Sequence, residues 1–314
     1  VIHLHWINEG FLSLRSLEKL FQLKKNIVWT FHDMWAFTGG CHYSGKCRSY
    51  ENTCSICPYL KNPADDDYSF KFFELKKKIY SSSKFKIITC SNWLKSCVKS
   101  STLLKEKIVE VIPNTIDTNR FNAIDKYEAR KKLQLESDKI YFLFTTLSTN
   151  EQRKGLSQLI ETLKFFKNNY SIPEKKYEII VIGKHDEKND FDFSFPVRYT
   201  GRINDDTVLA DYYSSADIFI APSLQDNLPN TVMESLACGT PVAAFNIGGM
   251  PDMIIHKENG FLARDESHED LALGIKYLLD ADTKSLSANA RKKVLENYSN
   301  DLIAQKHIEY YSRD

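Results

Sequence analysis

The fold is decided by one stretch of sequence: Pro222-Ser223-Leu224-Gln225-Asp226-Asn227-Leu228-Pro229-Asn230-Thr231-Val232-Met233-Glu234-Ser235-Leu236-Ala237-Cys238-Gly239-Thr240-Pro241. It follows an apolar run, 217–221, that is typical of a strand. A short helix is predicted to begin near Pro229 and Asn230, because proline suits the first turn and asparagine is a good cap. Gly239 ends this helix, and Pro241 opens the next strand, 242–245. The stretch therefore predicts a strand, a loop, a helix and a second strand.

The loop and the start of this helix are predicted to lie at the carboxyl end of a strand. In open α/β sheets ligands bind at this edge, and backbone N–H groups at a helix start attract phosphate. Asp226 on the loop and Glu234 inside the helix are eight residues apart, so both can face one ligand. Carboxylates accept hydrogen bonds from sugar hydroxyls. The alternative is that Asp226 caps the loop and Glu234 is an exposed helix residue.

The composition limits the class of protein. The 314 residues are 42% hydrophobic and 26% charged, which supports one or two packed α/β domains. The net charge of +1 gives no general attraction to nucleic acid. No apolar run approaches the roughly 20 residues of a membrane helix, and no signal peptide is seen, so we expect a cytoplasmic protein. The chain starts inside a predicted strand, Val1–Ile7, and we expect that an N-terminal segment precedes it.

The first part of the chain alternates between strand and helix. Val1–Ile7 and Ile27–Phe31 are predicted strands, and the segment between them, Ser13–Lys24, has leucines at helical spacing. This order implies parallel pairing. His32 and Asp33 follow the second strand directly and are candidate site residues at its carboxyl end. The alternative is a buried histidine satisfied by a backbone carbonyl.

A long irregular loop, residues 38–60, contains four of the seven cysteines: Cys41, Cys47, Cys54 and Cys57. A loop of this length needs something to order it, and four thiolates around Zn²⁺ would do so. The last two cysteines have the Cys-x2-Cys spacing of a zinc knuckle, whereas the first two are more widely spaced than usual. Two disulfides or four free thiols are the alternatives, and His42 could replace one cysteine. We predict a structural zinc site with no catalytic role.

Residues 68–109 are strongly basic, with ten lysines, no arginine and two glutamates. The lysines 71, 76, 77, 78, 84 and 86 lie beside Phe72 and Phe73 in this region. A basic face with aromatic side chains can dock on anionic lipid. A simply solvated face is the alternative to such a peripheral membrane contact.

The second part of the chain again alternates helix and strand. Helices are predicted at 126–135, from 156 to 166 and at 205–214, strands at 141–147, 176–183, 197–200 and 260–262, and three helices between 269 and 311. Arg153 and Lys154 precede the helix that begins near Leu156. Cations near a helix N-terminus disfavour each other unless an anion lies between them, so phosphate is expected here. An exposed turn is the alternative.

Asp226-x7-Glu234, followed by Cys238-Gly239-Thr240-Pro241-Val242, resembles the acidic-x7-Glu motif of retaining family 4 glycosyltransferases, which have the GT-B fold of two Rossmann-like domains. That family has Glu at the first position, one methylene longer than Asp226. Residues 112–121 resemble the segment that joins the two domains, with Thr115 in place of the usual Gly. The resemblance covers essentially the whole chain and is strongest over 141–262. It implies an incomplete acceptor-side domain over 1–120, a nucleotide-sugar-binding domain over 121–298, and a C-terminal helix, 299–314, that packs back on the first domain.

This resemblance implies transfer of a hexose-type sugar, with retention of configuration, from a nucleoside diphosphate sugar to a hydroxyl of a glycan or lipid-linked acceptor. It implies that Lys154 binds the diphosphate, that Glu234 binds the ribose, and that no catalytic metal is needed. The family's upstream arginine is missing, since Ser148 or a neighbour stands at that position, and Arg153 is the candidate substitute. It places Arg202 in a loop that lines the base, and His32 opposite the donor sugar. The candidate catalytic residues are His32, Asp33 and Asp226. The candidate donor-binding residues are Arg153, Lys154, Arg202, Asn227, Leu228, Pro229, Asn230, Thr231 and Glu234.

Two other classes of function fit the same residues. One is a nucleotide-sugar epimerase or hydrolase on this fold, and the other is a non-catalytic scaffold that binds sugar nucleotides. For the transferase, the resemblance implies a role in surface polysaccharide or glycolipid synthesis at the inner face of the membrane. No second carboxylate is placed as a clear nucleophile, which favours same-face attack over a covalent intermediate.

Overall fold

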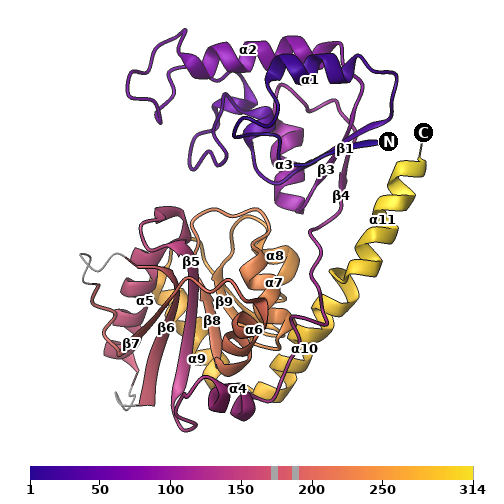
Figure 1. Ribbon diagram of the computed structural model, residues 1–314. Helices are drawn as coiled ribbons and strands as arrows, with labels where there is room; N and C mark the ends of the chain where they lie inside the picture. Colours follow the sequence, from indigo (N-terminus) through magenta and orange to yellow (C-terminus); the bar gives the residue numbers. More distant parts are fainter. Residues whose placement is uncertain (171–175, 186–190, 314) are drawn as a thin grey trace. The chain divides into compact units, whose positions relative to one another are not determined.

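The computed structural model describes residues 1–170, 176–185 and 191–313. The chain divides into two compact units (Figure 1). The first unit comprises Val1–Pro113 together with the C-terminal residues from Ala304 onward, and the second comprises Asn114–Ile303. Within the described residues, none of the helices combines the length and the apolar content needed to cross a membrane.

The first unit is built on a parallel sheet of four strands in the order β1-β2-β3-β4. The strands are β1 (Ile2–Leu4), β2 (Ile27–Phe31), β3 (Lys86–Thr89) and β4 (Val109–Val111). Every residue of β2 is buried, as expected for a central strand of a parallel sheet that is covered on both faces. The predicted first strand is shorter than expected, because pairing with β2 ends at Leu4.

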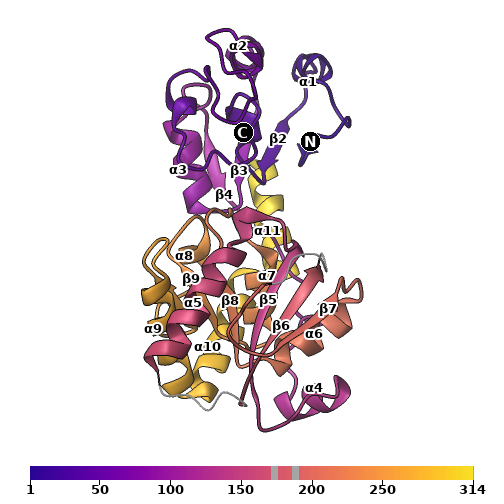
Figure 2. The same cartoon turned by 90° about the vertical axis from the view of Figure 1, so that its left-hand side faces the viewer.

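Three helices cover this sheet: α1 (Leu14–Phe21), α2 (Tyr68–Ser81) and α3 (Asn92–Ser100). Each begins after a capping side chain that accepts backbone N–H groups of the first turn, from Ser13, Asp67 and Ser91 respectively. The rings of Phe21 on α1 and Phe85 before β3 stack with centroids 4.6 Å apart, and Tyr80 on α2 packs against both. This aromatic cluster joins α1 and α2, which lie side by side (Figures 1 and 2).

The lysine-rich face predicted for residues 68–109 does not include Lys76, whose side chain is fully buried. Its Nζ donates to the carbonyl of Trp35 and, at 2.9 Å, to the carbonyl of Thr38. Phe73 is fully buried as well, because residues 73, 76 and 80 share the inner face of α2. The exposed part of this helix carries Lys71, Lys77 and Lys78 with Phe72, which is 44% exposed. The basic face is therefore smaller than the sequence indicates.

A chain of histidines lies at the carboxyl ends of β1 and β2. His3 Nδ1 lies 2.6 Å from the Tyr311 hydroxyl and Nε2 lies 2.8 Å from Thr30 Oγ1. His5 Nδ1 lies 3.0 Å from Nε2 of His32. The rings of His3 and His5 are 4.2 Å apart, and His307 packs on His3 at 5.3 Å. Burial, and then the neighbouring imidazoles, lower the pKa of His3 and of His32 to about 4.

We expect the first unit to lose stability as the pH falls from about 6.5 to about 4. Unfolded histidines take up protons near pH 6.5, whereas folded His3 and His32 resist protonation until about pH 4. The unfolded state therefore binds more protons in this window, and the free energy of unfolding decreases. All four tryptophans belong to the first unit, so fluorescence-detected urea unfolding reports on it directly. His3→Gln should flatten the pH dependence, whereas His268→Gln on the second unit should not. Equal slopes for wild type and His3→Gln would contradict this expectation.

The second unit contains six parallel strands in the order β10-β9-β8-β5-β6-β7 (Figure 1). They are β5 (Ile140–Ser148), β6 (Tyr177–Lys184), β7 (Val197–Gly201), β8 (Ile218–Ala221), β9 (Val242–Phe245) and β10 (Gly260–Ala263). Successive strands run outward from β5 to one edge, and the chain then returns to the other side of β5. This is the doubly wound order of Rossmann-like domains, with its switch point between β5 and β8. The predicted parallel α/β architecture is confirmed.

Helices flank this sheet in two groups. The bounds are α4 (Lys126–Lys132), α5 (Leu156–Asn169), α6 (Asp206–Ser215), α7 (Asn230–Ala237), α8 (Met250–Met253), α9 (His268–Asp280) and α10 (Thr283–Asn297). Helix α11 (Asn300–Ser312) begins in this unit, but its residues from Ala304 belong to the first unit, where the Tyr310 hydroxyl donates to the Ile87 carbonyl at 3.2 Å. Helix α5 packs with α9, whereas α6 packs with α4 and α7, and α7 packs with α10 (Figure 2). The apolar side chains of β8 and β9, and those of β5 from Tyr141 to Phe144, are buried between them. The carboxyl ends of the central strands β5 and β8 are thus held in place by the core, and the loops that follow them can carry a site.

Candidate functional site

Two loops meet at the switch point of the second unit, residues 149–155 after β5 and 222–229 after β8. The Leu224 N–H donates to the carbonyl of Arg153 at 2.9 Å, and Arg153 Nη1 donates to the carbonyl of Gln225 at 3.0 Å. Gly155 has φ +77°, and a Cβ at this position would lie 1.8 Å from the Pro222 carbonyl oxygen. Only glycine permits this approach without displacing the backbone.

A third loop, which follows β9, packs against the same place. The Gly249 N–H donates to the Asp226 carbonyl at 3.1 Å. Gly248 has φ +52°, and a Cβ there would lie 1.8 Å from that same carbonyl oxygen. The backbone of Asp226 is therefore fixed from both sides, which also fixes the position of its carboxylate.

Asp226 lies at the centre of a charged cluster. The residue is buried, and Oδ2 pairs with Lys154 Nζ at 2.7 Å and with Arg153 Nη1 at 3.0 Å. Arg153 also pairs with Glu151 at 2.6 Å. The structure thus brings together three residues that the sequence singled out separately. Both cations converge on Oδ2, while Oδ1 accepts the Asn227 N–H of the loop at 3.1 Å, so the carboxylate has both kinds of partner.

Glu234 is partly buried rather than exposed on the helix. Its Oε2 accepts a hydrogen bond of 2.8 Å from the hydroxyl of Tyr213, a fully buried residue of α6. Burial raises the pKa of Glu234, and the Tyr213 hydroxyl and the Lys154 charge act in the opposite direction. The exposed-residue alternative is therefore wrong.

The N-terminus of α7 carries no side-chain cap. Pro229 is the N-cap residue, so the predicted capping role of Asn230 is wrong; its Oδ1 instead accepts from Asn114 at 3.3 Å. The Pro229 carbonyl accepts from Val232 and Met233. Among the residues described, the N–H groups of Asn230 and Thr231 donate to no protein acceptor. Two oriented donors are thus open at the positive end of the helix dipole.

The remaining donor-site candidates lie at the same edge of the sheet. Asn227 and Leu228 are buried in the loop between Asp226 and α7. Arg202 is exposed directly after β7, the outermost strand, two strands away from β5. The position of Arg202 is therefore peripheral to the charged cluster.

His32 and Asp33 follow β2 in the first unit. His32 contacts His5 and, through Nδ1, the Cys90 sulfur at 3.5 Å. Asp33 Oδ1 accepts from the Trp35 N–H at 2.8 Å, and Oδ2 lies 2.7 Å from His42 Nδ1. Asp33 thus fixes the turn after His32. His42, considered above as a replacement zinc ligand, is paired with Asp33 instead.

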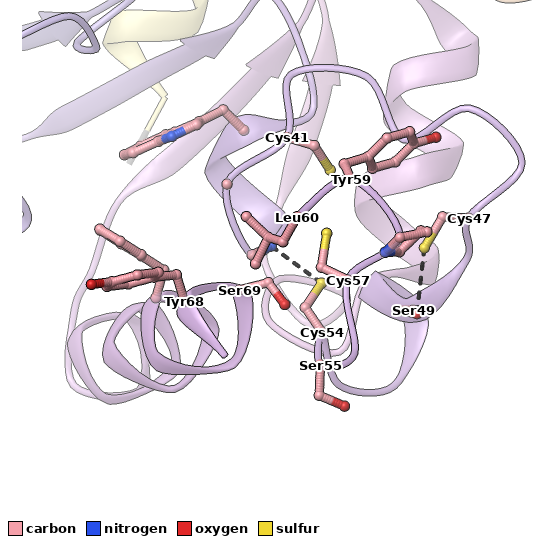
Figure 3. A pocket seen from close by; sticks show the side chains of 15 residues that line it. Cys41, Cys47, Ser49, Cys54, Ser55, Cys57, Tyr59, Leu60, Tyr68 and Ser69 are labelled. Carbon is pink, nitrogen blue, oxygen red and sulfur yellow. Dashed lines mark hydrogen bonds between the residues drawn. The ribbon is translucent and has the colours of Figure 1, made fainter. Parts of the chain in front are cut away.

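The four loop cysteines line one hollow of about 400 Å³ in the first unit (Figure 3). Cys54 is buried, the other three are partly exposed, and all four are free thiols, so the two-disulfide alternative is not adopted. Within residues 1–170, 176–185 and 191–313, no three His, Cys, Asp or Glu side chains are already gathered as a metal centre. The predicted ligands therefore share a cavity without forming a preassembled site.

Two family models match the chain. Glycosyl transferases group 1 matches residues 125–294, which is more than half of the chain, and Glycosyltransferase Family 4 matches residues 1–120. The chain belongs to the glycosyl transferases group 1 family. The resemblance inferred from Asp226 and Glu234 is thereby confirmed at the level of the family.

Several curated proteins that are similar to the chain carry the names of glycosyltransferases. An uncharacterized glycosyltransferase of Methanocaldococcus jannaschii is 28% identical over 72% of the chain and 59% of its own length. The capsular polysaccharide biosynthesis glycosyltransferase CapM of Staphylococcus aureus is 26% identical, over 74% of the chain and 63% of its own length. A Campylobacter jejuni enzyme named N,N'-diacetylbacillosaminyl-diphospho-undecaprenol alpha-1,3-N-acetylgalactosaminyltransferase is 26% identical, over 51% of the chain and 42% of its own length. The chain thus spans less than two thirds of the length of each of these relatives.

A solved structure shows the same fold. HepE of Anabaena in complex with UDP-glucose matches with a TM-score of 0.70 and 16% identity, over 99% of this chain and 78% of that chain. The similarity supports the GT-B architecture of two Rossmann-like domains for this family member.

Some residues of the site escaped the sequence interpretation. Tyr213 lies on a predicted helix without any motif, and only its distance to Glu234 shows its role. Gly155, just before α5, and Gly248, in the loop after β9, had a visible signal, because a glycine in such a loop often permits a close backbone approach. The positive φ angles and the 1.8 Å clashes identify them as structural requirements of the site.

Proposed function

We propose that this protein is a retaining glycosyltransferase that moves a sugar from a nucleoside diphosphate sugar to an acceptor hydroxyl, in surface polysaccharide or glycolipid synthesis. The proposal rests on the groups that lie together at the carboxyl ends of the central strands β5 and β8, called the β5–β8 edge. There Lys154 and Arg153, the carboxylates of Asp226 and Glu234, and the open N–H groups of α7 lie together. Membership of the family and the fold of a protein solved with UDP-glucose support this function.

Binding of the diphosphate is assigned to the positive groups of this edge. Lys154 and Arg153 supply charge, and the backbone N–H groups over 228–231 supply directed donors at a helix start. The same groups stabilise the diphosphate as it leaves with extra negative charge. This arrangement neutralises the leaving group without a catalytic metal. Asp226 holds both cations in position until the donor arrives.

Recognition of the sugars is assigned to the two carboxylates. Glu234 accepts from the ribose hydroxyls through Oε1, while Tyr213 holds Oε2. Asp226 and Asn227 face the hydroxyls of the transferred sugar, and the loop with Arg202 borders the base. A carboxylate paired with two cations is a weak nucleophile, since its negative charge is already compensated. We therefore favour same-face attack by the acceptor over a covalent intermediate through Asp226.

The acceptor is proposed to be a glycan or a lipid-linked sugar. Two relatives support this, one named for capsular polysaccharide synthesis and one for a diphospho-undecaprenol acceptor. Helix α2 exposes Lys71, Lys77, Lys78 and Phe72, which would attract an anionic membrane surface from the cytoplasmic side. Lys76 takes no part, because it is buried.

His32→Ala should lower kcat at least tenfold, about 1.4 kcal/mol of transition-state stabilisation, with little change in nucleotide affinity. The neutral imidazole has one N–H; with Nδ1 held by Cys90, Nε2 exchanges its contact with His5 for a sugar hydroxyl and donates to it as charge develops at the anomeric carbon. Transfer rate and nucleotide affinity should be measured on the same full-length variant, with His268→Ala as the control. A kcat close to that of the wild type would show that His32 has a structural role and takes no part in the transfer.

The function itself is tested by incubating the full-length protein with labelled UDP-, GDP- and ADP-sugars, with and without glycan and undecaprenyl-diphosphate-sugar acceptors. We expect consumption of one donor only when an acceptor is present, and a product whose anomeric configuration, determined by NMR, matches the donor. Equal consumption without an acceptor would indicate a hydrolase or epimerase. Binding of the donor without any consumption would indicate a scaffold.

A further inference from the structure

The Cys-rich loop of the first unit, residues 38–60, lies outside the proposed donor site. It contains no long helix or strand. Between β2 and α2 the chain forms only two short 3₁₀ helices, Trp35–Phe37 and Ser49–Glu51. The four cysteines that line its hollow come from different parts of this loop (Figure 3). A loop of this length that still has a defined course needs a local source of order.

Burial raises the pKa of the Cys54 thiol to about 11, while one backbone contact acts in the opposite direction and would suit a metal-bound thiolate. Its sulfur accepts the backbone N–H of Gly39 at 3.2 Å. A Cβ on Gly39 would lie 2.6 Å from the Ser69 carbonyl oxygen and 2.8 Å from Cys54 Cβ, so the backbone is packed directly against the cysteine. Hydrogen bonds from outside the ligand set orient metal ligands and stabilise their charge.

A buried lysine lies under the same loop. Lys76 is fully buried and donates to the carbonyls of Trp35 and Thr38, which precede Gly39. Burial lowers the pKa of its amine to about 7, and Cys41, Cys54 and Asp33 act in the opposite direction. A buried ammonium is costly without nearby negative charge. A zinc ion with four thiolates carries two net negative charges, which Lys76 would partly offset.

The sulfurs have not yet gathered around a common point. In Figure 3 the sulfurs of Cys41, Cys54 and Cys57 face the interior of the hollow, whereas Cys47 is turned to Ser49, to whose Oγ it donates at 3.4 Å. We propose that Zn²⁺ binds the thiolates of Cys41, Cys47, Cys54 and Cys57 and draws Cys47 away from Ser49, fixing the loop that follows His32 and Asp33. The reaction is Zn²⁺ plus four thiols, giving a tetrahedral tetrathiolate complex and four protons.

The first test is the metal content of the full-length protein purified under reducing conditions. We expect about one zinc per chain, released by a mercurial reagent in step with modification of the thiols. Cys57→Ser should lose the zinc, whereas Cys97→Ala, which removes a buried thiol of α3, should retain it. Cobalt exchange of the wild-type protein, which does not depend on a variant folding, should give the visible absorption of a tetrahedral thiolate site.

Two outcomes would overturn the proposal. One is protein without zinc whose thermal unfolding midpoint is unchanged by zinc or by a chelator. The other is zinc that persists in Cys57→Ser, or mass spectra of the isolated protein that show the four cysteines joined as disulfides. Because none of these measurements uses nucleotide or sugar transfer, their result is independent of the proposed glycosyltransferase activity.

Discussion

Lys154→Ala should lower the rate of sugar transfer by about 10²–10³-fold, the usual cost of removing one group that stabilises a developing negative charge. Lys154 is the cation nearest to the Asp226 carboxylate, at 2.7 Å, and its charge also acts on Glu234. Its removal takes positive charge from the place where the leaving diphosphate is proposed to lie. The measurement is kcat of the full-length protein with saturating donor.

The control for this variant is Lys139→Ala. Lys139 pairs with the buried Glu178 at 3.0 Å, much as Lys154 pairs with Asp226. It lies directly before β5, at the amino ends of the strands and not at their carboxyl ends. Its loss should affect stability without affecting transfer. A folded Lys154→Ala protein with a kcat close to that of Lys139→Ala would remove Lys154 from the mechanism.

Glu234→Ala should weaken nucleoside diphosphate affinity by about 1.5–3 kcal/mol, the range for a charged hydrogen bond, or roughly 10- to 150-fold. The carboxylate is the proposed acceptor for the ribose hydroxyls and is held by Tyr213. Affinity is measured by titration calorimetry. Exposed Glu296 on α10 provides the matched control, Glu296→Ala, which should bind as the wild type does.

Loss of Glu234 also leaves the buried Tyr213 hydroxyl without its acceptor, which costs stability. Glu234→Gln keeps an acceptor for Tyr213 while removing the charge, so it separates the two effects. We expect its affinity to lie between those of the wild type and Glu234→Ala. Unchanged nucleotide affinity in both folded variants would show that Glu234 does not bind the ribose.

The sequence predicted the architecture well because local signals and the global fold agree. Runs such as 27–31 and 242–245 are short, apolar and followed by turn residues, so their strand character is visible without any partner. The carboxyl end of a parallel strand is a site position by topology alone, which is why Asp226 and Lys154 could be placed before their contact was known.

Features that depend on partners distant in the chain could not be predicted. A lysine in a lysine-rich helix is expected to be exposed. Lys76 is buried instead because the carbonyls of Trp35 and Thr38 accept its hydrogen bonds. The histidine chain joins His3 to Tyr311, more than 300 positions apart. Tyr213 meets Glu234 because α6 and α7 pack together. Each case needs tertiary packing that periodicity does not encode.

The central claim is that the β5–β8 edge binds a nucleoside diphosphate. It is tested most directly by calorimetric titration of the full-length wild-type protein, Lys154→Ala, Glu234→Ala and Lys139→Ala with UDP, GDP and ADP. We predict that one nucleotide binds the wild type and Lys139→Ala with one site per chain, and that it binds both other variants at least tenfold more weakly. Binding with equal affinity to all four proteins, or no binding of any nucleotide to the wild type, would contradict the claim.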